Sequence, residues 1–329
     1  MAWLASDLVA TVKLRAMLPT SSSAPGTADA DVLAHANDEL QSFMVPMLLS
    51  INEEYFTATT DVPLVAGQDV YRLPDRSAAS KLREVWAVGG NILINLPRIE
   101  PEALNQWVNN ATGVPAAFIM EAGGIRLVPK PSASGYSLRM RYFARPALMT
   151  VDTAQYARIL TASYLSPSST TLTLAHSTTA GQGMLTPSLG DGYLYDLIAG
   201  RPPFEHLGFQ GWCTAVGPNF RFSWPDTISP SLQGATGANG AQIGDFITAL
   251  DVSPIVQLPQ ELHSLLAQRV TARILHQLGR FDAASAATTE AERMAKVALN
   301  MLTPRVDGAA RVVMGLLQSG RRNIFRVGS

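Results

Sequence analysis

Cysteine is almost missing from this sequence: Cys213 is the one cysteine in 329 residues. A single cysteine excludes an intrachain disulfide framework and a zinc site built from cysteine thiolates. Long apolar runs are also missing, since nowhere do about 18 uncharged apolar residues follow one another, and we expect no transmembrane helix. Asp7, Lys13 and Arg15 interrupt the apolar residues near the start, so we expect no signal peptide. The sequence therefore predicts a protein that stays in a reducing compartment, or in a particle assembled there.

Charged side chains are scarce as well. They make up 16% of the chain, and the formal net charge is −1; a typical soluble domain has about 25% charged residues. A neutral chain lacks the global basic field with which many proteins bind nucleic acid. A sparsely charged surface is typical of a subunit that other copies of itself cover. A monomer with a neutral surface rich in Gly, Ser and Thr is the alternative.

The patterns that signal catalysis or metal binding are absent. The five histidines include no His-Glu-x-x-His motif and no pair four residues apart, so we expect no metal site. No Gly-x-Ser-x-Gly elbow is present, and the glycines between positions 234 and 244 lack the Gly-Lys-Ser/Thr of a phosphate loop. Asp191 and Asp196 flank two tyrosines, and we interpret both as surface turn residues. We therefore expect no enzymatic activity and no cofactor.

An aromatic cluster allows one binding function to be considered. Trp212, Phe220, Phe222 and Trp224 lie close together in the sequence, and stacked aromatic side chains on a β module can bind sugars or bases. Strand alternation places three of them on one face, where a core position is the default. We favour the core interpretation.

Helical patterns are present at both ends of the chain. After Pro259, apolar residues recur every three or four positions up to Leu278, and Gly279 suits a left-handed helix cap. A second helix then runs from Asp282 to Pro304. Two such helices cannot bury their apolar faces against each other alone, so they need the helices predicted at residues 6–17 and 27–51. The expected core of this helical body includes Leu40, Leu262, Leu266, Ile274 and Leu278.

Strand patterns occupy the middle of the chain. Residues 61–150 contain two hairpins, marked by the glycine pairs at 89–90 and 123–124, and residues 151–250 form a second β module rich in Ser, Thr and Gly. The predicted fold class is α+β, with a helical bundle base formed by both chain ends, inserted antiparallel β modules and an extended C-terminal tail. The predicted boundaries are 1–60, 61–150, 151–250, 251–304 and 305–329.

The tail from Arg305 to Ser329 is basic and apolar at intervals. It has five arginines against one aspartate, and this pattern favours docking into a partner, by strand addition or groove insertion, over disorder. We expect the arginines to pair with acidic groups or to face passing DNA. The predicted docking residues are Val313, Arg321, Arg322, Ile324, Phe325 and Arg326.

Several stretches in a fixed order resemble one family. These stretches are 12–19, 31–33, 37–40, 46–55, 71–76, 258–263 and 269–279, which include Asn37-Asp38-Glu39-Leu40 and Leu258-Pro259-Gln260-Glu261-Leu262-His263. The chain resembles the head-to-tail adaptor (connector, head-completion) proteins of tailed bacteriophages, best at both ends and thinly between residues 150 and 250.

The resemblance implies a structural virion protein without a catalytic site. Such proteins form a ring, usually of twelve copies, beneath the portal and next to a tail tube, nozzle or tail-terminator protein, and DNA passes through the axial channel without sequence recognition. The protein would be made in the host cytoplasm and located at the head-tail junction, with no membrane partner. The large second β module goes beyond the smallest members of the family. The alternative function is a tail-associated carbohydrate- or receptor-binding β module on a helical base.

Overall fold

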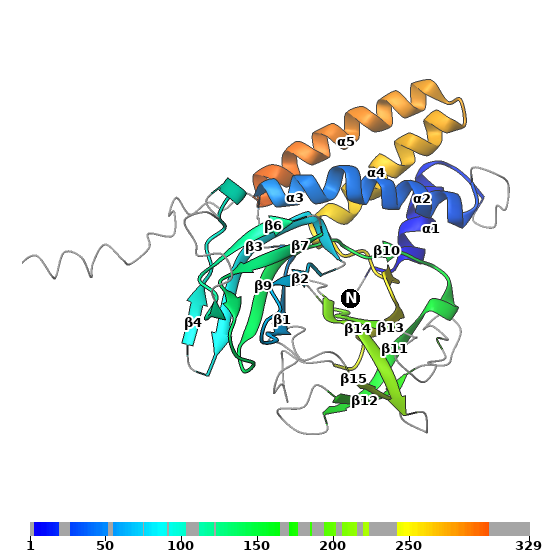
Figure 1. Ribbon diagram of the computed structural model, residues 1–329. Helices are drawn as coiled ribbons and strands as arrows, with labels where there is room; N and C mark the ends of the chain where they lie inside the picture. The colour runs from blue at the N-terminus through cyan, green and yellow to red at the C-terminus, as the bar shows by residue number, and fades with distance from the viewer. Residues whose placement is uncertain are drawn as a thin grey trace, which may run out of the picture.

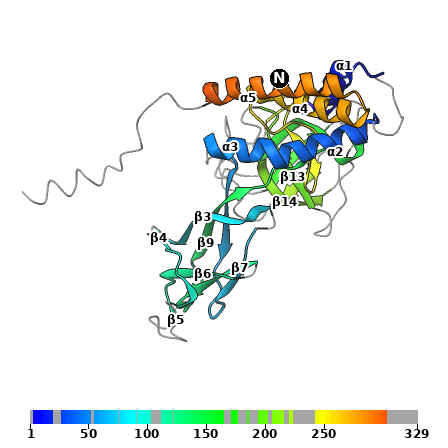
Figure 2. The same ribbon diagram turned by 90° about the horizontal axis from the view of Figure 1, so that it is seen from above.

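The computed structural model confirms the α+β class. It describes residues 3–19, 27–51, 55–74, 76–90, 92–102, 112–121, 123–164, 171–176, 185, 194–201, 206–215, 220–223 and 242–302. Figure 1 shows the helices in one layer, with two β units beneath it, and Figure 2 shows the first β unit projecting away from that layer. Among the described residues, no helix is both long and apolar enough to cross a membrane.

Helices from the two ends of the chain share one hydrophobic core, which we call the helical body. The helices are α1 (Ala5–Arg15), α2 (Asp29–Glu39), the π-helical turn η1 (Leu40–Met44), α3 (Val45–Ile51), α4 (Gln260–Gln277) and α5 (Phe281–Leu302). In the core, α4 contacts α1, α2 and α5. Leu40, Leu262, Leu266 and Ile274 are each at most 1% exposed there. The stripe of apolar residues on α4 therefore packs against helices that are more than 200 residues distant in sequence.

A π-helical turn precedes Pro46 within the helical stretch predicted at residues 27–51. Proline has no N–H, so the helical hydrogen bond from residue 46 cannot form. The turn directly before it, η1, widens the helix, and the Val45 N–H donates to the Leu40 carbonyl five residues earlier. The chain therefore continues from α2 into α3 without a loop.

The expectation for Leu278 is wrong. This residue caps the C-terminus of α4 and is 37% exposed. The chain leaves the helix at this point, because Gly279 follows with a φ of +74° and turns toward α5. The apolar spacing of α4 thus extends one residue beyond the end of the helix, to a position where the Leu278 side chain is only partly covered.

The first β unit consists of small sheets around a second core. A four-stranded antiparallel sheet has the order β1-β9-β3-β4, and the order β2-β7-β6 gives a three-stranded sheet. The strands are β1 (Thr57–Pro63), β2 (Val70–Arg72), β3 (Ser77–Gly89), β4 (Ile92–Asn95), β5 (Thr112–Gly113), β6 (Ala117–Glu121), β7 (Gly124–Val128), β8 (Lys130–Pro131) and β9 (Ser137–Ala144). Both predicted hairpins are confirmed: Gly90 and Gly123 have positive φ at the turns between β3 and β4 and between β6 and β7.

The second β unit is a closed six-stranded barrel with the order β11-β12-β15-β14-β13-β16. Its strands are β11 (Tyr156–Tyr164), β12 (Thr171–His176), β13 (Leu194–Ile198), β14 (His206–Ala215), β15 (Phe220–Ser223) and β16 (Phe246–Ala249). A short 3-10 helix, η3 (Thr153–Gln155), precedes β11. The strands that enter and leave the barrel, β10 (Leu148–Met149) and β17 (Val252–Ser253), pair in parallel. Since both connections lie side by side, the barrel is inserted at one place in the fold.

This geometry predicts that the barrel can be removed. Replacing residues 151–249 with a short Gly/Ser bridge should leave a folded, soluble protein, because β10 and β17 already lie next to each other. Circular dichroism should then show the helical signal and a cooperative melting transition. A matched deletion of β3 and β4 (residues 77–95), which removes Val85 and Ala87 from the core of the first β unit, should unfold that unit. Aggregation of the barrel deletion would contradict the insertion.

Candidate functional site

The clearest features of the structure are the contacts that join the helical body and the two β units. Within the described residues, no group of three or more His, Cys, Asp and Glu side chains could hold a metal ion. His35 Nε2 lies 2.9 Å from Gln277 Oε1, so this histidine joins α2 to the end of α4. The candidate functional features are therefore the contacts that fix the modules and the surfaces left exposed.

A buried carboxylate joins α2 to α4. Glu39 is 2% exposed, and its two oxygens each lie 2.5 Å from an arginine Nε, Oε2 from Arg269 and Oε1 from Arg273. The Arg269 guanidinium also lies 3.6 Å from the centre of the Phe43 ring. Two guanidinium groups thus contact one buried carboxyl group, and Arg273 also lies 3.7 Å from Asp38, so the end of α2 is tied to α4.

The segment between the two β units is fastened to the helical body by amide side chains. Asn37 on α2 binds both backbone groups of Met149: its Nδ2 donates to the carbonyl at 3.3 Å and its Oδ1 accepts from the N–H at 2.8 Å. Gln257 Oε1 accepts from the Ala147 N–H at 2.8 Å. Asn37 thus pairs with β10 as a neighbouring strand would.

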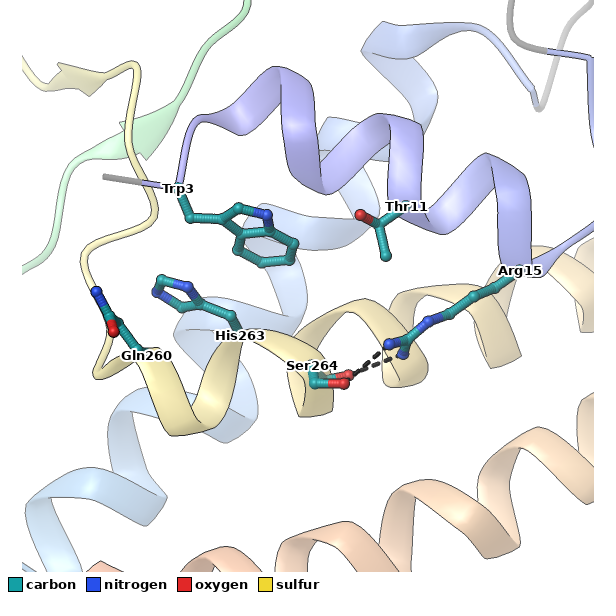
Figure 3. Close-up of a pocket in the computed structure, with 6 residues that line it drawn as sticks. All are labelled: Trp3, Thr11, Arg15, Gln260, His263 and Ser264. Carbon is teal, nitrogen blue, oxygen red and sulfur yellow. Dashed lines mark hydrogen bonds between the residues drawn. The ribbon is translucent and has the colours of Figure 1, made fainter. Parts of the chain in front are cut away.

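A hollow of about 480 Å³ lies between α1 and the start of α4 (Figure 3). Trp3 stacks on His263 with ring centres 4.7 Å apart, and burial lowers the pKa of His263. Arg15 donates from Nη1 to the Ser264 carbonyl at 3.0 Å and from Nη2 to the Ser264 hydroxyl at 2.8 Å. Because the basic and aromatic side chains of this hollow bind the chain itself, we interpret it as the joint that fixes α1 on α4.

The two β units are joined by a buried ion pair. Arg76, just before β3, donates from Nη1 to Asp196 Oδ2 on β13 at 2.6 Å, and these side chains are 6% and 0% exposed. The Asp251 N–H also donates to Asp196 Oδ2, at 3.1 Å, while Arg76 Nη2 donates to the Arg145 carbonyl. Burial raises the pKa of the neighbouring Tyr142, an effect that Arg76 opposes and Asp196 strengthens. The interpretation of Asp196 as a surface turn residue is therefore wrong, because its partner lies 120 residues earlier in the chain.

Exposed apolar side chains gather where α1 ends. Met17 is 86% exposed and has a φ of +54°, the left-handed region that favours glycine. It follows the helix cap Ala16, and the Leu18 N–H donates to the Lys13 carbonyl, which closes the capping turn. A side chain in this conformation costs on the order of 1 kcal/mol relative to glycine. Packing against the described residues does not offset that cost, since the Met17 side chain is 86% exposed.

The predicted site residues divide into two groups. The structure brings Leu40, Leu262, Leu266 and Ile274 together in the helical body. The predicted docking residues Val313, Arg321, Arg322, Ile324, Phe325 and Arg326 lie outside the described residues, as do Asp191 and the side chains of the aromatic cluster. The sequence pointed to the stretches that contain Asn37, Glu39 and Arg76, but not to the roles of these residues.

Comparison with known protein families gives one match. The model of the SU10 adaptor protein family matches residues 4–198, more than half of the chain. The match includes α1 to α3, the first β unit and the barrel as far as β13, and with them both Arg76 and Asp196. No curated protein matches the sequence.

Proposed function

Because the chain belongs to the SU10 adaptor protein family, we propose that it forms a ring between the portal and the tail of a bacteriophage virion. The ring consists of copies of this chain, twelve by analogy with the proteins that it resembles, around an axial channel for DNA. One face meets the portal and the other meets a tail tube, nozzle or tail-terminator protein. The protein acts by positioning these partners, without catalysis.

The family match is the single observation that carries this proposal. Several contacts support a role that depends on rigidity. The barrel is attached to the helical body through Asn37 and to the first β unit through Arg76. A ring subunit has to hold its two interfaces at a fixed angle, since a heterologous contact closes only for one rotation between neighbours.

The C-terminal tail is proposed to bind an adjacent subunit or the portal. Phe325, Ile324 and Val313 are the apolar anchors, and the nearby arginines pair with acidic groups or face the DNA. Burial of one phenylalanine contributes about 1.5–3 kcal/mol, and linked copies in a ring act together, so the effect on attachment multiplies.

Truncation after Thr303 tests this function. The truncated protein should melt like the full chain, because the helical body ends at Leu302, but it should not join heads to tails. The measurement is the amount of adaptor on heads purified from a phage that carries the truncation, together with infectivity. A control chain with Arg321, Arg322 and Arg326 changed to lysine keeps the charge and should retain attachment. Normal occupancy and infectious particles from the truncated phage would sink the proposal for the tail.

A further inference from the structure

Two groups of exposed apolar side chains lie at opposite ends of the helical body. The turn-end patch consists of Leu14, Met17, Leu278 and Phe281, which are 37–86% exposed. The exit-end patch consists of Val297 and Met301, which are 47% and 66% exposed. These side chains are large and apolar, and none of the six belongs to the hydrophobic core. Exposed apolar groups of this kind mark interaction surfaces when they gather in one place.

The turn-end patch is one surface formed by two elements. Arg280, in the turn between α4 and α5, donates from Nη1 to the Ala16 carbonyl at 3.2 Å, which fixes that turn against the end of α1. Leu14 lies in the last turn of α1, and Met17 follows the helix cap Ala16. Phe281 packs edge-on against His276 at 5.2 Å between ring centres, so the ring is held in place while most of it stays exposed.

Met17 is the strongest sign that this surface has an external partner. α1 and α4 end in the same capping turn, and the two turns lie next to each other. At the left-handed position α4 has Gly279, the residue that this conformation favours, whereas α1 has Met17. A methionine at a position that favours glycine, with its side chain in solvent, points to a contact outside the described part of the chain.

The two patches are placed for contact between different ends of two copies. Phe281 and Met301 begin and nearly end α5, about 30 Å apart at 1.5 Å per residue. Figures 1 and 2 both show the turn between α4 and α5, beside α1, at one end of the helical layer, and the end of α5, beside α3, at the other. Exposed Asp282 follows Phe281, and exposed Lys296 precedes Val297. Exposed Arg280 precedes Phe281, so the turn end carries both signs, and contact between unlike ends allows Lys296 of one copy to pair with Asp282 of the other.

We propose that the turn-end patch of one copy binds the exit-end patch of a second copy of this chain. The contact is heterologous, so its repetition generates a closed ring when the rotation between neighbours divides a full turn. This inference rests on the proposed function, because it assigns the surfaces through which the proposed ring assembles.

The first test replaces Met17 with glycine in the full chain. Glycine suits the left-handed position, so the melting temperature of the dilute monomer should stay the same or rise, while self-association should weaken about tenfold or more. Met301→Ser should weaken self-association similarly. Leu93→Ser is the matched control, since Leu93 is also exposed but lies on β4. Analytical ultracentrifugation over a concentration series measures all four proteins.

The second test uses pairs of introduced cysteines. The natural Cys213 is buried, so it does not compete in cross-linking. Under mild oxidation, Met17→Cys with Met301→Cys should give a ladder of linked copies, and each single variant should give none. Dimers from Met17→Cys alone would show contact between like ends and overturn the inference. If the wild type forms a ring, Met17→Gly forms the same ring, and the double cysteine variant yields no ladder, the inference is overturned while the proposed ring function stands. A wild-type chain that stays monomeric at every concentration would contradict both. If Met17→Gly self-associates normally but no longer attaches to heads, the turn-end patch binds another protein and the inference is overturned.

Discussion

Replacing Leu266 with aspartate is expected to unfold the helical body. Leu266 is fully buried in the middle of α4, within the core that both chain ends share. The change removes a leucine whose burial contributes about 1.5–3 kcal/mol. It also places a carboxylate among apolar neighbours, which costs several kcal/mol more or forces the group to take up a proton. The sum is comparable with the roughly 5–15 kcal/mol that stabilises a whole domain.

Leu278→Asp is the matched control for this prediction. It makes the same chemical change one residue beyond the end of the same helix, at a side chain that is 37% exposed. A carboxylate at the C-terminal end of a helix costs about 0.3–1 kcal/mol, which is well below the cost expected for Leu266→Asp. Circular dichroism melting of both variants at low concentration measures the difference. Similar melting curves for Leu266→Asp and the wild type would show that the helices from the two ends do not depend on a common core.

Removing the Asp196 carboxylate is expected to have the second largest effect. In Asp196→Ala the guanidinium of Arg76 loses the oxygen at 2.6 Å, and the arginine is left 6% exposed between the two β units. Breaking a buried ion pair by removing one partner costs about 3–5 kcal/mol, because the remaining charge is uncompensated. Asp251 lies 3.3 Å from Arg76 but is largely exposed, so it offsets this loss only in part. Urea unfolding should show the loss.

The double variant Arg76→Met with Asp196→Leu tests the cause. Apolar replacement of both partners removes the unpaired charge, so stability should recover relative to Asp196→Ala. Glu290→Ala is the surface control: it breaks the exposed pair with Arg293 on α5 and should change stability little. If Asp196→Ala behaves like Glu290→Ala, the ion pair does not hold the two β units together.

The sequence predicted the parts of this fold that depend on local patterns. The glycine pairs marked both hairpins of the first β unit, and the apolar spacing after Pro259 marked α4. The limits appear where the deciding neighbour is distant. Asp196 was placed at the surface because nothing nearby in the sequence reveals that Arg76 reaches it. Leu278 was placed in the core because apolar spacing does not show where the covering helices end.

The barrel and the candidate surfaces show the same limit. Ser/Thr/Gly-rich strands indicate a β module, but closure depends on the pairing of β11 with both β12 and β16, which lies beyond local patterns. Met17 stands out only after its backbone angle is known, since a methionine at the end of an amphipathic helix is ordinary in sequence. Asn37 is similar, because its role depends on the position of Met149.

The position of Asn37 and Glu39 on one helix has a mechanical consequence. Asn37 hydrogen-bonds to β10, which leads into the barrel. Two residues later, Glu39 forms ion pairs with Arg269 and Arg273 on α4. A load applied to the barrel therefore passes through α2 into α4 by way of hydrogen bonds and ion pairs, and not only along the covalent chain. Any swinging of the barrel against the helices has to break the Asn37 contacts or drag α2 along. The protein therefore resists rotation of the barrel relative to α4, because α2 is bound to both β10 and α4.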